Sequence, residues 1–107
     1  MLKVHAPSDI FTPIGPYVVT GDEIGDPHNL HIHLTVNGQT RQDVNSRDML
    51  TNIPQMISYA SRVFTLNPGD VFTTGSPPGV GQIHDGDVMV TNIEKIGQMT
   101  NYVKKRG

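Results

Sequence analysis

The sequence predicts a mainly β domain of the α+β class with a single helix, and three observations support this. Apolar and polar residues alternate over residues 30–36 and are followed by Asn37-Gly38, which is the pattern of a β-hairpin. Only residues 49–64 carry apolar residues at helical spacing. The chain has 11 glycines and 8 prolines among 107 residues, a density that favours short strands and turns. We expect one domain spanning residues 1–107.

The first elements follow in chain order. Residues 15–21 predict a short strand, and residues 22–29 predict a loop. Residues 30–43 predict an antiparallel hairpin with one apolar face. Asn37-Gly38 predicts a type I′ turn, because both central residues of that turn need positive φ. The apolar side chains of the first strand are Leu30, Ile32, Leu34 and Val36, and His31, His33 and Thr35 alternate with them.

The predicted helix spans residues 52–64, with Thr51 or Asn52 as the N-cap and Pro54 in the first turn. Its apolar stripe consists of Met49, Ile53, Met56, Ile57, Ala60 and Phe64. We expect the hairpin and this helix to form the core. The side chains expected to be buried are Leu34, Val36, Ile53, Ile57 and Phe64.

Two similar segments follow the helix, residues 67–74 and residues 84–91. Each predicts a Gly-Asp turn that leads into a short β-branched strand. The last strand pair is expected over residues 88–97 and 98–103.

Composition excludes several classes of function. The formal net charge of −2 argues against nucleic acid or anionic lipid as the main partner. Because the chain has no cysteine, disulfides, thiolate metal sites and a cysteine nucleophile are excluded. No apolar run has membrane-spanning length, and the N-terminus does not resemble a signal peptide. We therefore expect a cytoplasmic protein without a nucleic-acid or membrane partner.

The glycine-rich stretch Thr73–Gly81, TTGSPPGVG, is the main candidate site. A Walker A loop needs a lysine and a following helix, and a dinucleotide-binding loop also needs that helix. This stretch has no lysine, and turn and strand residues follow it. Nucleotide binding is therefore rejected. A structural loop, or a loop that presents hydroxyl and backbone N–H groups to a small anion, remain as alternatives.

The histidines give a weaker signal. His31 and His33 lie two residues apart on a predicted strand, so they share one face. They are candidates for a metal-binding pair, but the solvent face of the hairpin is the favoured interpretation. His28 and His84 lie in predicted turns without an assigned role. Ser76 lacks the Gly-x-Ser-x-Gly context of an activated nucleophile.

Read in order, residues 9–43, 45–81 and 86–97 resemble the C-terminal part of the fumarylacetoacetate hydrolase family, and the likeness extends from about Asp9 to Val103. The loop of that family is usually Thr-Gly-Thr-Pro-x-Gly-Val-Gly, which residues 74–81 match with Ser76 in place of the second threonine.

The resemblance implies a mixed β-roll in which Mg²⁺ or Mn²⁺ binds a 2-oxo or enol acid. Family members hydrolyse C–C bonds of acylpyruvates, or decarboxylate, hydrate or isomerise related compounds. It further implies that Thr74, Gly75 and Ser76 contact the carboxylate or oxo group of the substrate.

The sequence also departs from the family. The family carries a Glu-x-Glu pair and a later aspartate as metal ligands upstream of this region, whereas the only glutamates here are Glu23 and Glu94. The family lysine is replaced by Ala6 and a nearby threonine by Ile10, and Lys3 lies three positions too early. We therefore assign no catalytic residue and no metal ligand, and we expect this chain not to bind the metal by itself.

Three hypotheses follow. In the first, the chain is an incomplete part of a metal-dependent enzyme, inactive alone and self-associating or strand-swapped through unpaired sheet edges. In the second, it is a non-catalytic assembly module that pairs with a full-length paralogue or a separate N-terminal chain. In the third, a metal site is rebuilt from Asp9, Asp43, Asp48 or the His31/His33 pair, although hard divalent ions need several convergent oxygens.

Overall fold

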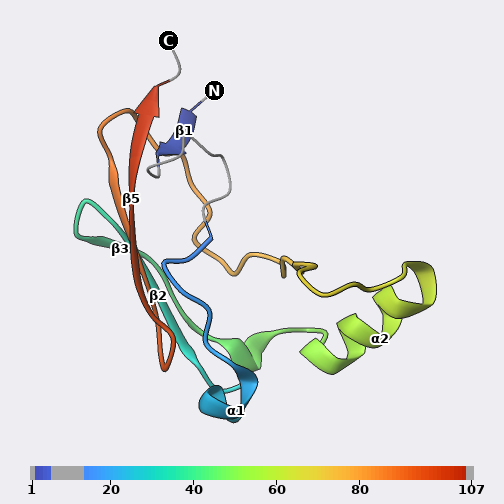
Figure 1. Cartoon of the computed structure of the whole chain (residues 1–107). Coiled ribbons are helices and arrows are strands. Elements are labelled where there is room, and N and C mark those ends of the chain that lie inside the picture. Colours follow the sequence, from blue (N-terminus) through green and yellow to red (C-terminus); the bar gives the residue numbers. More distant parts are fainter. Residues whose placement is uncertain (1, 6–13, 106–107) are drawn as a thin grey trace.

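The strands of this protein form one antiparallel sheet in the order β1–β5–β4–β2–β3 (Figure 1). The computed structural model describes residues 2–5 and 14–105. In these ranges the strands are β1 (Leu2–His5), β2 (His31–Val36), β3 (Gln39–Asn45), β4 (Val88–Ile93) and β5 (Gly97–Lys105). The helical elements are α1 (Gly21–Ile24), η1 (Ser46–Asp48) and α2 (Ile53–Val63). The predicted mainly β fold with one main helix is confirmed.

The β2–β3 hairpin forms where the alternating pattern places it. Asn37 has φ of 52° and Gly38 has φ of 80°, so both central residues of the turn are left-handed and the type I′ prediction is confirmed. The turn is also attached to the next hairpin. The Asn37 N–H donates to the carbonyl of Val88, and the Val88 N–H donates to the side-chain oxygen of Asn37, both at 2.9 Å.

A β-bulge interrupts the β2–β3 pairing. Thr35 pairs with Thr40, but the next residue of β2, Leu34, pairs with Gln42. Arg41 is therefore the extra residue of the bulge. The pairing beyond Arg41 is shifted by one residue, which decides the face on which each later side chain of β3 lies.

The sheet has one apolar and one polar face, as alternation requires. Register places Leu34 opposite Thr91 and Val36 opposite Met89, and places Met99 next to Thr91 on β5. The buried hydrophobic residues among those described are Leu30, Val36 and Val103. The predicted burial of Val36 is confirmed, while Leu34 is only half-buried.

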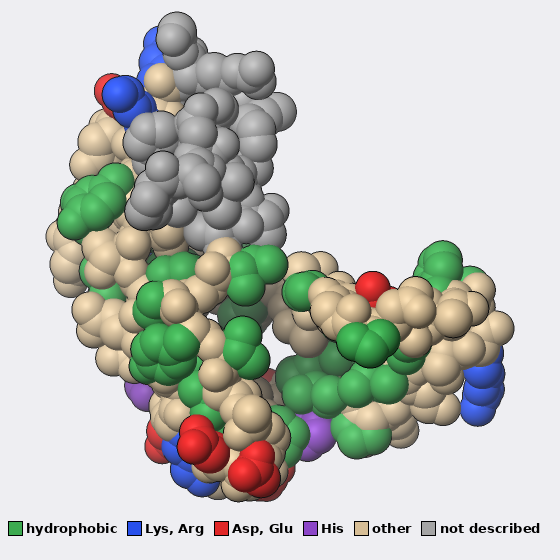
Figure 2. Space-filling model, in the orientation of Figure 1, with side chains coloured by type: hydrophobic (Ala, Val, Ile, Leu, Met, Phe, Trp, Pro, Cys, Tyr) green, Lys and Arg blue, Asp and Glu red, His purple; other side chains and the backbone are tan. Residues whose placement is uncertain are grey.

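Helix α2 begins as predicted but does not pack as predicted. Asn52 caps it in a capping box with Gln55, and Pro54 lies in the first turn. The predicted burial of Ile57 and Phe64 is wrong, because their side chains are 42% and 67% exposed; Ile53 is half-buried. The helix projects away from the sheet (Figure 1), and its apolar residues line an open hollow (Figure 2). Among the described residues, nothing buries Ile57 or Phe64, whereas Met49, Met56 and Ala60 are half-buried.

Two predicted strands are absent from the described structure. Residues 15–20 are irregular and lead into α1, and residues 71–74 form no strand either. Both segments have β-branched and aromatic residues, but a ladder also needs a neighbouring backbone. Residues 15–17 instead cross the face of the sheet, and Val71 and Phe72 are exposed (64% and 45%).

The molecule is more open than its length requires. Its radius of gyration is 15.2 Å, whereas a compact domain of this length has about 13 Å. No helix in the described ranges is long and apolar enough to cross a membrane.

The attachment between the two hairpins depends on a carboxylate. Asp87 accepts hydrogen bonds from the His84 N–H and from the Asn37 side-chain amide, both at 2.8 Å. These bonds, that of His84 first, hold the pKa of Asp87 below its ordinary value of 3.8. A lowered folded-state pKa contributes stability that is present above the unfolded pKa and is lost as pH falls through the folded one.

We predict that Asp87→Asn flattens the acid limb of the stability profile. The free energy of unfolding of the wild type, measured by urea denaturation, should fall as pH drops below about 4. In Asp87→Asn this fall should be shallower, because the group that takes up the proton is gone. Asp48→Asn, at an exposed position of η1, removes the same charge outside this hydrogen-bonded group and is the matched control. Parallel profiles for Asp87→Asn and wild type would contradict the prediction.

Candidate functional site

The predicted substrate loop, Thr74 to Ser76, is an exposed segment between α2 and β4. Among the described residues, no backbone hydrogen bond outside helices and strands involves residues 71–76. Gly75 separates two hydroxyl-bearing side chains, and Pro77 and Pro78 follow. Hydroxyl and N–H groups on such a loop are free to donate to an anionic oxygen.

The loop is attached to β3 immediately after Ser76. The side-chain amide of Gln42 donates a hydrogen bond of 3.1 Å to the carbonyl of Pro77. The guanidinium of Arg41 donates one of 3.2 Å to the carbonyl of Gln82. The two residues at the bulge of β3 therefore hold both ends of the segment 77–82.

Between these two attachments the loop backbone touches the bulge itself. Gly79 has φ of +108°, and a Cβ added there would lie 1.9 Å from the carbonyl oxygen of Arg41 and 2.9 Å from Cγ of Gln42. Only glycine fits both the conformation and the space. Gly79 of the motif therefore serves close backbone contact with β3 in this structure, whereas a Cβ at Gly75 would meet nothing within 4 Å.

The sequence did not reveal the part played by Arg41 and Gln42. If side chains alternated between the two faces without interruption from the turn onward, Gln42 would lie on the opposite face of the sheet. The bulge that changes this has no reliable signal in the sequence. His28 was also missed. Its Nε2 accepts a hydrogen bond of 3.0 Å from the Ile53 N–H, which satisfies one of the free donors at the start of α2.

The histidine pair lies on the polar face of the sheet. The rings of His31 and His33 are stacked with centroids 6.0 Å apart. His31 is hydrogen-bonded to Asp43, and His33 Nε2 lies 3.0 Å from the hydroxyl of Thr40. The bond with His31 holds the pKa of Asp43 below its ordinary value. Each ring therefore has a hydrogen-bond partner on β3.

Among residues 2–5 and 14–105, no group of three or more histidine, aspartate or glutamate side chains is arranged to hold a metal ion. Of the residues considered for a rebuilt metal site, Asp9 lies outside the described residues. Ala6 and Ile10, which replace the family lysine and threonine, lie outside them too. The described residues therefore do not fit the metal that the family resemblance implies.

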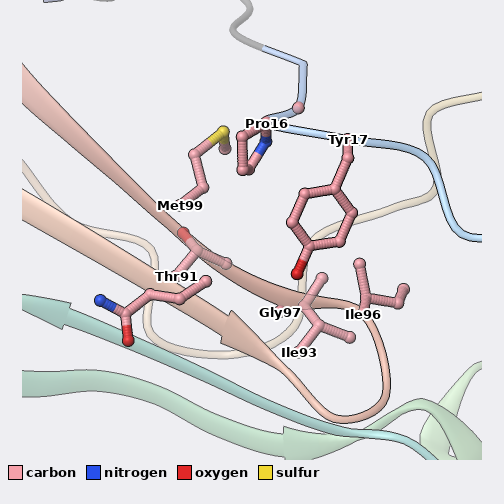
Figure 3. Close-up of a pocket in the computed structure, with 9 residues that line it drawn as sticks. Pro16, Tyr17, Thr91, Ile93, Ile96, Gly97 and Met99 are labelled. Atoms are coloured by element: carbon pink, nitrogen blue, oxygen red, sulfur yellow. The ribbon is translucent and has the colours of Figure 1, made fainter.

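A small open pocket lies elsewhere, on the apolar face of the sheet (Figure 3). Tyr17 and Pro16 lie over β4, β5 and the turn between them, and the ring of Tyr17 points toward Gly97. The other labelled lining residues are Thr91, Ile93, Ile96 and Met99. None of its lining residues is charged.

Comparison with known proteins identifies the family. Residues 5–104 match the family model described as fumarylacetoacetate (FAA) hydrolase, C-terminal. The chain therefore belongs to the fumarylacetoacetate hydrolase family. The crystal structure of maleylpyruvate hydrolase from Sphingobium sp. SYK-6 in complex with manganese(II) ion and pyruvate is similar to it, with a TM-score of 0.86 and 43% identity over 92% of this chain.

Two curated relatives show the range of activities. A 2,4-didehydro-3-deoxy-L-rhamnonate hydrolase from Sphingomonas sp. (strain SKA58) is 46% identical over 91% of this chain. A 4-hydroxyphenylacetate degradation bifunctional isomerase/decarboxylase from Salmonella dublin is 41% identical over 89% of it. This chain spans only 37% of the first relative, 22% of the second and 38% of the solved structure.

We predict that Gly79→Ala destabilises the fold more than Gly69→Ala does. Both glycines have positive φ, +108° and +94°, but a Cβ at Gly69 meets nothing within 4 Å. The backbone conformation alone should cost about 1–2 kcal/mol in either variant. The collision with Arg41 should add at least about 1 kcal/mol at Gly79. Equal losses in urea denaturation would show that the contact with β3 contributes nothing.

Proposed function

We propose that this chain supplies the residues that bind the acid group of the substrate in a metal-dependent enzyme of the fumarylacetoacetate hydrolase family. Its substrate class is 2-oxo or enol acids, and its reaction is C–C bond hydrolysis, decarboxylation or isomerisation of acylpyruvate-like compounds. The observation that carries this proposal is the exposed Thr74–Ser76 segment, held against β3 immediately after Ser76, within the region that matches the family.

The role of the loop is to donate hydrogen bonds to the substrate. The Ser76 and Thr74 hydroxyls and the Gly75 and Ser76 N–H groups donate to the carboxylate or oxo oxygen of the acid. Hydrogen bonds to an ionised oxygen are stronger than those between neutral groups. They also position the acid for the reacting centre.

The metal of the proposed enzyme, Mg²⁺ or Mn²⁺, is not held by this chain alone. Its described residues offer no group of three ligands, and the sequence has no Glu-x-Glu. A relative of known structure contains manganese(II) together with pyruvate, and the chain spans 38% of that relative's length. We therefore propose that the carboxylate ligands come from a part of the enzyme that these 107 residues do not contain, and that these residues alone are inactive.

A hybrid enzyme tests this proposal. The upstream part of the Sphingobium maleylpyruvate hydrolase is fused to this chain, and turnover of an acylpyruvate with Mn²⁺ is measured. The hybrid should be active, and Ser76→Ala should lower its kcat/KM at least about tenfold, since a hydrogen bond to a charged group is lost. Ser76→Thr should retain activity because it keeps the hydroxyl.

Ser58→Ala, on an exposed position of α2, is the matched control and should leave kcat/KM unchanged. The proposal is contradicted if Ser76→Ala matches the unmutated hybrid. Stoichiometric Mn²⁺ binding with turnover by the unfused chain would contradict the part of the proposal that places the metal ligands elsewhere.

A second candidate function is a non-catalytic assembly module, and the large exposed surface favours it. The chain exposes 7907 Å², whereas a compact monomer of this mass exposes about 5900 Å². The difference of about 2000 Å² is within the range that one partner buries in an obligate interface. We propose that the occupant is the upstream part of a family chain, from a full-length paralogue or a separate N-terminal chain. Without it, the chain forms homo-oligomers or exchanges strands with another copy.

We predict that the unpartnered chain self-associates through the apolar stripe of α2. In sedimentation velocity the wild type should form oligomers, because Ile57 and Phe64 are 42% and 67% exposed. The double variant Ile57→Ser/Phe64→Ser should sediment as a monomer with its helical circular dichroism retained. Arg62→Ser, on the opposite face of α2, is the control and should associate like the wild type. A monomeric wild type at high concentration would refute the prediction.

A further inference from the structure

The bulge in β3 determines which residue can reach the substrate loop. Without the bulge, the pairing of Thr35 with Thr40 would continue as Leu34 with Arg41 and His33 with Gln42. Gln42 would then lie on the polar face, beside the histidine pair. In the observed register Gln42 pairs with Leu34 and shares its apolar face, from which its amide reaches the carbonyl of Pro77. A one-residue shift therefore brings this donor to the loop.

We propose that Arg41 and Gln42 form a clamp that positions the hydroxyl and N–H groups of residues 74–76 for the acid. The residues of this β3 clamp do not touch the substrate; they act through the backbone that follows Ser76. The proposal rests on the proposed function for the role of the loop, but the existence of the clamp is tested independently of it.

Three contacts make the clamp. Gln42 binds the carbonyl of Pro77, one residue after Ser76, and this hydrogen bond is partly buried, so water competes for it less than at the surface. Arg41 binds the carbonyl of Gln82 at the far end of the segment. Between them the Arg41 carbonyl lies against the bare Cα of Gly79, so the loop cannot approach closer or turn over without a collision.

The clamp should contribute strongly to the position of residues 74–76, because the segment before it lacks comparable hydrogen bonds. Residues 71–76 take part in none of the backbone hydrogen bonds outside helices and strands that the described residues form. They are also exposed. The Gln42–Pro77 bond is therefore the first attachment that the chain meets after Ser76. Loss of this bond should release Ser76 from its position without unfolding the sheet.

The test compares isotope-labelled wild-type chain with two variants of nearly the same size, Gln42→Leu and Gln42→Glu. Neither variant can donate to the Pro77 carbonyl at neutral pH. Gln39→Leu is the control, because Gln39 lies on the same strand, is exposed and pairs with Val36 next to the turn. Backbone order parameters of residues 74–76 report the clamp, and amide shifts on titration with pyruvate report acid binding.

We expect the order parameters of residues 74–76 to fall from about 0.85 to below about 0.6 in both Gln42 variants, with the amides of β2 and β4 unchanged. Pyruvate affinity should fall about fivefold, the effect of one lost hydrogen bond. Gln39→Leu should match the wild type in both measurements.

Unchanged order in the Gln42 variants would overturn the clamp. A mobile loop with unchanged pyruvate affinity would overturn its positioning role. If the amide shifts of the wild-type chain do not change on titration with pyruvate, the proposal that the loop of the isolated chain binds the acid is wrong. The order parameters still decide whether the clamp exists.

Discussion

The β2–β3 hairpin is the constraint on which the rest of this structure depends. Its turn needs two consecutive left-handed residues, which Asn37 and Gly38 provide, and this sets the first pairs of the ladder. The bulge at Arg41 then shifts the ladder by one residue. Because side chains alternate between faces, that shift places Gln42 with the loop and Asp43 with the histidines. One irregularity thus organises both faces of the sheet.

The two faces consequently have different roles. The apolar face carries the open pocket and the attachments of residues 77–82, including the segment that follows the proposed acid-binding residues. The polar face carries His31, His33 and Asp43, and each histidine is hydrogen-bonded across to β3. The loop resembles a phosphate-binding loop in its glycine content, but Gly79 serves close contact with β3.

The helix and the sheet are each well formed, yet they bury little of each other. Capping, proline placement and the His28 bond all act at the start of α2, and none of them requires its apolar stripe to be covered. Hydrophobic burial normally decides how such a helix docks. Here Ile57 and Phe64 of the stripe remain exposed. The chain spans 37% of the length of one relative, and we propose that these side chains belong to an interface.

The sequence by itself determined what depends on neighbours along the chain: the hairpin with its Asn37-Gly38 turn, the capped helix from Ile53, the last strand pair and the family. Local conformation and periodicity suffice for these. Tertiary structure alone decided the rest. Residues 15–20 and 71–74 have strand-forming residues, but a strand also needs a partner backbone, and none of the described strands pairs with them. Ile57 and Phe64 have the spacing of a buried stripe, but burial needs an opposing surface. The side chains that hold the loop could be found only from the bulge, because a shift of one residue in register reverses the faces of a strand and leaves no mark on its composition.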